Sequence, residues 1–496
     1  MKKVTSLSAK TTKALSVFGV MKATNVIISI LSIFILAKLL SPEDFGLVAM
    51  ASVFAIAMQT AFQIPVNQAL ILKKNPDRDD FNTAFTINVI RGAAIFGLLA
   101  SIAYPLSIFY EEPLVTLIAI AFSISLLLSG FENPSLITLE QELKVKRILY
   151  LNVIAQFSGV IISIVIALET GSYWAMVIGH IANQIVRLVL SYFFQPYVPW
   201  FSLVHWKAML SFSIWISLSK LVLTLADKLD QILIGKVLGA TILGQFNIGN
   251  EIARKPTQEF SGILNRGLFP AFSKLRNDSH RSLMAYQNAI SVSTSLFFPV
   301  GVGIALLAEP VVLLTLGTKW QDSIIIVQAL GAISALSNVN SITKALFMAN
   351  NMTKSIFKRD FVFACTKIVL VIAGLSLNGL EGVLMAIASG RLIMLIINWF
   401  MVKQTFGLKI ASQFALLLRQ TFSVLIMAGL FIWWLPAINI PETINIETSS
   451  KIILQIMWHA TIGVLIYITS HVTLWLALRR PLGLEEKLLS LIKKSN

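Results

Sequence analysis

The chain has a single cysteine, Cys365, among its 496 residues, so neither a disulfide framework nor a thiolate metal site can be built from it. Charged residues are also scarce, at 13% of the sequence, whereas 56% of the residues are apolar. A chain of this composition cannot keep its apolar surface away from water as a soluble domain. These shortages favour a protein that lies in a lipid bilayer.

Motifs for catalysis are missing as well. The sequence has no GxxxxGK[ST] run, and the pair Gly301 and Gly303 lies in an apolar segment without a preceding strand, which excludes it as a nucleotide-binding loop. No nucleophile-elbow or paired-carboxylate signature stands out. The five histidines have no metal-ligand spacing; they are His180, His205, His280, His459 and His471. The sequence therefore predicts neither an enzyme nor a resident cofactor.

Long apolar segments are what the sequence does contain. Segments of about 20 residues cross a hydrocarbon core of about 30 Å, and they must be helical because lipid offers the backbone no hydrogen bonds. We expect helices over residues 16–37, 45–67, 84–106, 114–132, 150–168, 173–194, 209–234, 246–268, 288–308, 323–349, 357–375, 382–402, 416–436 and 452–478. The fold class is an all-α integral membrane protein of about fourteen transmembrane helices.

Basic residues are concentrated in alternate connections between these helices. With the N-terminus in the cytoplasm, most Lys and Arg residues outside the spans fall on the cytoplasmic side, which fits an even helix count and two cytoplasmic termini. The formal charge of +16 is then explained by loops that face anionic membrane lipids. A nucleic-acid partner is not needed.

An internal repeat organises the chain. A shift of 198 positions without a gap lays Lys22–Asp80 over Lys220–Asp278 and matches Gly46 with Gly244. Six predicted helices separate the copies, so the copies point the same way and form a parallel repeat. We expect two pseudo-symmetric six-helix lobes, residues 1–208 and 209–410, followed by two C-terminal helices in residues 411–496.

The repeat also identifies a span that hydropathy alone would miss. Gly244–Phe260 is polar, but its repeat mate, Gly46–Phe62, is plainly apolar. A polar spanning helix is best explained by a wet, protein-lined interior on one side. The sequence thus predicts a transporter with its pathway between two lobes that alternate access by rocking.

Cations predominate among the charges inside the predicted spans. Such charges are costly in lipid, so they line a cavity, form pairs or reach a helix end, and an excess of cations calls for an anionic ligand. Lys22 and Lys220 occupy equivalent places in the two lobes, as a pseudo-symmetric cavity requires. The candidate substrate-binding residues are Lys22, Lys220, Arg254, Arg266, Lys344, Lys367, Arg391, Arg91 and Arg187.

Two acids are candidates for a coupling-ion site. Asp227 and Asp230 are three residues apart and so share one helix face, where they could hold a proton or sodium ion. A plain ion pair with Arg254 or Lys228 explains them equally well.

Five stretches of the chain resemble a known family. They are AKLLSPEDFGLVAM (37–50), RDDFNTAF (78–85), ADKLDQILIGKVLG (226–239), PTQEFSGILNRGLFPAF (256–272) and PVGVGIALLAEP (299–310). Together they are similar to the polysaccharide-type (Wzx-like) flippases of the multidrug/oligosaccharidyl-lipid/polysaccharide exporter superfamily, in particular the branch that exports colanic-acid-like and O-antigen units.

This resemblance implies a fourteen-helix, V-shaped protein of the bacterial inner membrane that moves an undecaprenyl-pyrophosphate-linked oligosaccharide to the periplasmic leaflet. It implies a cationic cavity that includes Lys22, Lys220, Arg254 and Arg266, and a place beside a polysaccharide polymerase and a chain-length regulator. Relatives often carry arginine where this chain has Lys22 and Lys220, and lysine binds phosphate without the bidentate fork of arginine. The rival is an ion-coupled exporter of drugs, whose cationic substrates favour intramembrane acids. A membrane-bound glycan polymerase or ligase would need a large outer loop, and the outer connections here look short.

Overall fold

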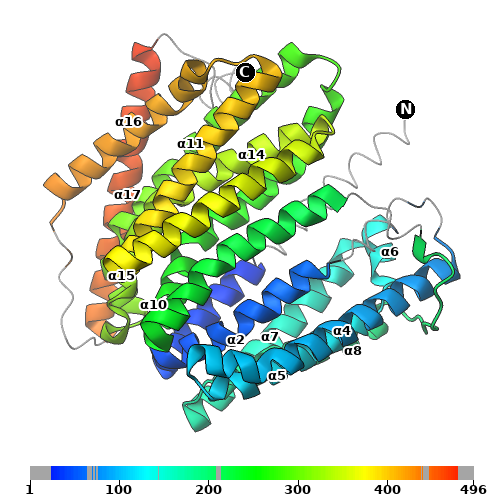
Figure 1. The fold of residues 1–496 in the computed structure, drawn as a ribbon. Helices are drawn as coiled ribbons and strands as arrows, with labels where there is room; N and C mark the ends of the chain where they lie inside the picture. Colours follow the sequence, from blue (N-terminus) through cyan, green and yellow to red (C-terminus); the bar gives the residue numbers. More distant parts are fainter. Residues whose placement is uncertain are drawn as a thin grey trace. The chain divides into compact units, whose positions relative to one another are not determined.

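The computed structural model describes residues 24–478 except for 64–69, 71–72, 74–75, 143, 208–213, 437 and 439–445. Within the described residues every regular element is a helix, which confirms the all-α fold class. The α-helices, most of them labelled in Figure 1, are α2 (Pro42–Ala61), α4 (Arg78–Tyr110), α5 (Leu114–Gly130), α6 (Leu136–Gln141), α7 (Val145–Thr170), α8 (Trp174–Phe194), α10 (Ile214–Lys274), α11 (Ser279–Leu306), α12 (Ala308–Thr315), α13 (Ser323–Ser334), α14 (Leu336–Ala349), α15 (Thr353–Phe406), α16 (Ile410–Trp434) and α17 (Ile446–Ala477).

Two of these helices are too long for one crossing. At 1.5 Å per residue the 61 residues of α10 would extend about 90 Å, three times the hydrocarbon thickness. α10 is broken by non-helical backbone at Gly239, with a φ of 83°, and α15 by Asn378 and Gly379. Each is therefore a pair of successive spans.

The number of spans agrees with the sequence prediction. Ten helices or helix pairs in the described residues are long and apolar enough to cross a membrane, with α13 and α14 counted as one, and two shorter apolar helices cover Thr24–Leu39 and Leu114–Gly130. Since α10 and α15 count twice, the described chain holds fourteen such segments. The protein is a multi-pass membrane protein.

The chain separates into two compact units, residues 1–247 and 248–496. In the first, α5 packs on α2, α4 and α8, and α7 packs on α8. In the second, α11 packs on α13, α14 and α16, while α16 packs on α17. The predicted lobe boundaries at residues 208 and 410 stay predictions.

A backbone contact in the first unit joins two helices that the repeat makes equivalent. A Cβ built on Gly46 of α2 would lie 1.8 Å from the carbonyl oxygen of Ala240, and one built on Gly244 of α10 would lie 1.8 Å from that of Pro42. Pro42 and Ala240 are themselves 198 residues apart, as Gly46 and Gly244 are. The contact is therefore reciprocal, as expected where repeat mates meet about a local two-fold axis.

Candidate functional site

The predicted cationic residues are spread over both units, and two of them cannot be placed. Lys22 and the side chain of Arg266 lie outside the described part of the chain. Lys220 is exposed on the first half of α10, where its ammonium donates a hydrogen bond to the side-chain carbonyl of Gln63. Arg254 is half-buried on the second half of α10 and donates to Asn250 over 3.5 Å. Their contact with substrate stays a prediction.

Arg187 belongs to a polar cluster in the first unit. Its Nε lies 2.7 Å from Glu132 Oε1, and its Nη1 donates to Asn152 Oδ1 over 2.8 Å. Gln184 donates to the same Glu132 oxygen over 2.9 Å, and Arg91 on α4 lies within electrostatic range of that carboxylate. Glu132, Asn152, Gln184 and Arg187 form the Glu132 cluster. Arg187 and Arg91, both predicted to bind substrate, therefore have an acidic neighbour.

Lys344 belongs to a second cluster, in the second unit. Asp360 is fully buried, and its carboxylate lies 2.6 Å from Arg359 Nη2 and 3.9 Å from Lys344 Nζ. Arg359 also donates to Asn398 Oδ1 over 3.0 Å, and Asn398 donates to Asn340 Oδ1 over 2.6 Å. These residues form the Asp360 cluster. Arg359 and Asp360 are both buried, and neither is among the candidate residues that the sequence suggested.

The two clusters occupy equivalent places in their units. Asn152 and Asp360 each lie seven residues after the first residue of their helix, Val145 of α7 and Thr353 of α15. The Glu132 cluster joins the fourth, fifth and sixth predicted spans, and the Asp360 cluster joins the tenth, eleventh and twelfth. Each ties together the last three helices of a predicted six-helix lobe, a role that the sequence reading missed. The equal helix positions of Asn152 and Asp360 emerge only from the structure, because the predicted spans begin at residues 150 and 357.

Lys367 and Arg391 lie on the two halves of α15. Lys367 is only 3% exposed, although it sits in an apolar span. A Cβ built on Gly390 would lie 3.9 Å from Lys367 Cγ, so the residue before Arg391 packs against the Lys367 stem. The hairpin thus brings Lys367 close to the backbone next to Arg391.

The acids Asp227 and Asp230 lie on the first half of α10. Asp230 is 5% exposed and Asp227 is half-buried. The ammonium of Lys228 donates to Gln231 Oε1 over 3.0 Å, and Gln231 donates to Asn247 Oδ1 over 3.2 Å. Polar side chains therefore surround this stretch, and its binding of a coupling ion stays a prediction.

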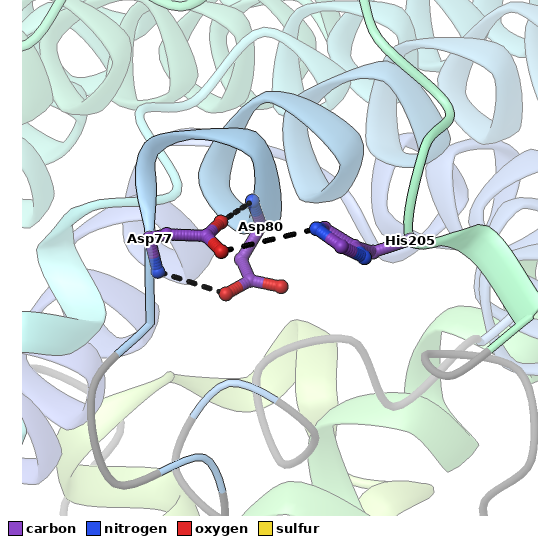
Figure 2. A group of neighbouring side chains, drawn as sticks. All are labelled: Asp77, Asp80 and His205. Carbon is purple, nitrogen blue, oxygen red and sulfur yellow. Dashed lines mark hydrogen bonds and ion pairs between the residues drawn. The ribbon is translucent and has the colours of Figure 1, made fainter.

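A group of three possible metal ligands lies at the start of α4. Figure 2 shows Asp77, Asp80 and His205, with His205 Nε2 3.8 Å from Asp77 Oδ2. Asp77 and Asp80 form a capping box in which each side chain accepts from the other's backbone N–H. Lys73 Nζ lies 2.5 Å from Asp80 and 3.4 Å from Asp77, so an ammonium already neutralises the carboxylates. We assign the group to the helix cap and not to a metal.

The cap has electrostatic consequences outside the membrane span. The backbone N–H of Asp80 and the charge of Lys73 hold the pKa of Asp77 below its usual value, while partial desolvation opposes them. The hydrogen bond to Asp80 raises the pKa of Lys73. Both shifts favour the charged forms, so the cap is an ionic one.

Lys73→Met is expected to speed amide hydrogen exchange in the first turn of α4, because the buried Asp80 carboxylate would lose its cation. Lys144→Met is the matched control, since its partner Glu142 is exposed and such pairs stabilise little. Exchange measured by mass spectrometry checks this. Equal exchange in α4 of Lys73→Met and the wild type would show that the backbone bonds alone hold the cap.

A profile of the family described as polysaccharide biosynthesis protein matches residues 35–325, more than half of the chain. The chain belongs to the polysaccharide biosynthesis protein family. All five stretches that carry the resemblance in the sequence lie within the matched residues. The resemblance to the polysaccharide-type flippases is thereby confirmed.

Several named relatives match most of the length of this chain. It is 25% identical over 386 residues to the lipopolysaccharide biosynthesis protein WzxC of Escherichia coli (strain K12), covering 75% of this chain and 77% of WzxC. It is 24% identical to an uncharacterized membrane protein in the cps region of Klebsiella pneumoniae, covering 81% of this chain and 84% of that protein. It is 25% identical to the succinoglycan biosynthesis transport protein ExoT of Rhizobium meliloti (strain 1021), covering 58% of each chain.

Solved structures show the same fold. The lipid II flippase MurJ in its inward closed conformation matches with a TM-score of 0.71 at 15% identity, covering 93% of this chain and 99% of MurJ. An inward-facing multidrug resistance MATE family transporter of the MOP superfamily matches with a TM-score of 0.61 at 16% identity, covering 77% of this chain and 94% of that chain. This family member therefore has the transporter fold that the repeat predicts.

Proposed function

We propose that this protein is a flippase that moves undecaprenyl-pyrophosphate-linked oligosaccharide repeat units from the cytoplasmic to the periplasmic leaflet. The observation that carries the proposal is family membership, together with relatives named for lipopolysaccharide, succinoglycan and amylovoran biosynthesis. The product serves surface polysaccharide synthesis, as lipopolysaccharide O-antigen, colanic acid or exopolysaccharide. The protein transports and does not catalyse.

The chemistry of the substrate agrees with the charges of the chain. A pyrophosphate cannot cross hydrocarbon unaided, and cations inside the protein replace part of its hydration while the polyprenyl tail stays in lipid. Lys220, Arg254 and Lys367 are candidates for this contact among the described residues. Alternating access carries the head group across, with Asp227 and Asp230 as the site for a coupling proton or sodium ion.

The surroundings follow from the same proposal. The protein lies in the bacterial inner membrane with both termini in the cytoplasm, as the distribution of basic connections favours. A polysaccharide polymerase and a chain-length regulator are its expected partners in the periplasmic steps. The rival is an ion-coupled drug exporter, which the MATE-like fold alone would allow.

The deciding measurement is the leaflet distribution of undecaprenyl-pyrophosphate-linked glycan in cells with and without the protein. Build-up in the cytoplasmic leaflet of cells that lack it supports the flippase. A normal distribution with altered sensitivity to cationic drugs would favour the exporter.

Lys220→Ala is expected to slow export about tenfold, as loss of one charge-assisted hydrogen bond to a phosphate would. Lys220→Arg should keep most of the activity, because it keeps the charge. The matched control is Lys207→Ala, an exposed lysine in the connection before α10. Surface polysaccharide is measured at equal amounts of protein in the membrane. Normal export in Lys22→Ala/Lys220→Ala would contradict the central cationic cavity.

A further inference from the structure

The chain between α8 and α10 exposes apolar side chains that the proposed transport does not use. Residues 195–205, which we call the connecting segment, follow α8 and form neither helix nor strand. They precede residue 208, the predicted end of the first lobe. Their most exposed side chains are all apolar; they are Val198, Trp200, Phe201 and Val204, at 77%, 71%, 63% and 69%.

Side chains of α4 bind the backbone of the connecting segment. Three of its N–H groups donate to three buried side chains in the first turns of α4: Trp200 to Asn82 over 2.9 Å, Ser202 to Thr86 over 2.9 Å, and His205 to Thr83 over 3.4 Å. The Tyr197 hydroxyl also donates to Asn82 Oδ1, over 2.8 Å. The connecting segment therefore lies along the start of α4, with these backbone donors turned toward that helix.

The same contacts place the connecting segment at the level of the lipid head groups. The 33 residues of α4 extend about 50 Å, against about 30 Å for the hydrocarbon core, so its ends reach beyond the core. The bonded α4 residues, 82–86, lie within about 12 Å of its first residue. α8 is itself long and apolar enough to span a membrane, and the connecting segment begins where α8 ends.

The bonding pattern suits contact with lipid. Irregular backbone beside lipid needs partners within the protein, because hydrocarbon offers its N–H groups none. Asn82, Thr83 and Thr86 supply such partners from α4. With those donors turned toward the protein, the exposed surface of the connecting segment consists largely of apolar and aromatic side chains, and tryptophan is enriched where a protein crosses the head-group layer.

We propose that the connecting segment is a lipid-binding surface that lies in the head-group layer, with membrane phospholipid as its partner. Its exposed apolar side chains point toward the acyl chains, and α4 presents them by binding the backbone behind them. In the proposed orientation this is the cytoplasmic leaflet. The connection between the two predicted lobes is thus anchored to the membrane on the side of the first lobe. This surface does not depend on the proposed substrate.

The test measures how deep single side chains of the connecting segment lie in the bilayer. The full chain in phospholipid nanodiscs carries one nitroxide label at a time, in a Cys365→Ser background, at Val198→Cys, Phe201→Cys or Val204→Cys. Oxygen concentrates in lipid, whereas a charged nickel chelate stays in water. The ratio of their collision rates with the label therefore reports its depth.

Two further labels in the same unit calibrate this ratio. Ile161→Cys, exposed in the middle of α7, gives the value in lipid, and Glu142→Cys, exposed just before α7, gives the value in water. We expect the three labels of the connecting segment to give ratios well above that of Glu142→Cys. Ratios equal to it would mean a water-facing surface, open to a protein partner, and would overturn the proposal. Low collision rates with both reagents would mean that protein covers the segment, and would overturn it as well.

Asn82→Ala tests whether α4 presents the surface. The substitution removes the acceptor that Tyr197 and Trp200 share, so the label at Val198→Cys should become more mobile and collide more often with the nickel chelate. Asn88→Ala is the matched control, because Asn88 lies on the same helix and makes none of these bonds. An Asn82→Ala protein that gives the same reading as Asn88→Ala would overturn the role of α4.

Discussion

Asp360→Ala is expected to lower the free energy of unfolding by about 3 to 5 kcal/mol, because it strands the charge of Arg359 inside the protein. The Arg359 side chain is 2% exposed, and its Nη2 and Nε lie 2.6 and 2.8 Å from Asp360 Oδ1. Its remaining partner, Asn398, is neutral and cannot balance the guanidinium. The expected loss of stability reflects the penalty for leaving the Arg359 charge buried without a counter-charge, and not the net contribution of the ion pair to stability.

Two further variants separate the penalty of the stranded charge from the contribution of the ion pair. Asp322→Ala changes an exposed acid at the start of α13 that makes no side-chain cap, and it should alter stability by less than about 0.5 kcal/mol. Arg359→Met/Asp360→Leu removes both charges and should recover most of the loss, since apolar replacements of a buried pair are often neutral. Unfolding is followed in detergent with denaturant. An Asp360→Ala protein as stable as Asp322→Ala would mean that water reaches the cluster.

The helices were predictable because lipid imposes one rule on every span. Runs of apolar residues predicted fourteen segments, and the repeat correctly extended helix to the polar residues after Gly244. The sequence reading separated the seventh and eighth helices by a connection, whereas in α10 a single break at Gly239 suffices, because glycine adopts the positive φ without strain.

The partners of the intramembrane charges were not predictable in the same way. Arg187 and Glu132 are 55 positions apart, so their pairing depends on how α8 packs beside the end of α5. The cost of a charge in an apolar span shows that a buried cation needs a polar or charged partner. It does not show whether that partner is a side chain or a substrate. The burial of Asp360 was not predicted because this residue lies near the start of a helix, where the sequence alone suggests contact with water.

Gly244→Ala is expected to destabilise the protein by about 1 to 3 kcal/mol, the usual cost of overpacking. The new Cβ would lie 1.8 Å from the carbonyl oxygen of Pro42, so two backbones must move apart. The matched control is Gly97→Ala in α4, where no atom lies within 4 Å of the built Cβ. There the loss of unfolded-state freedom should stabilise by about 0.4 to 1 kcal/mol, so the same chemical change has opposite signs at the two sites.

The reciprocity of the contact makes a sharper test. Gly46→Ala should cost about as much as Gly244→Ala, because its Cβ meets Ala240 at the same distance. Both substitutions force the same two backbones apart, so the double variant should lose clearly less than the sum of the single losses. Thermal unfolding of the four proteins measures this coupling. Additive losses would mean that the two glycines relax independently, and the crossing of α2 and α10 would then not act as one contact related by the repeat.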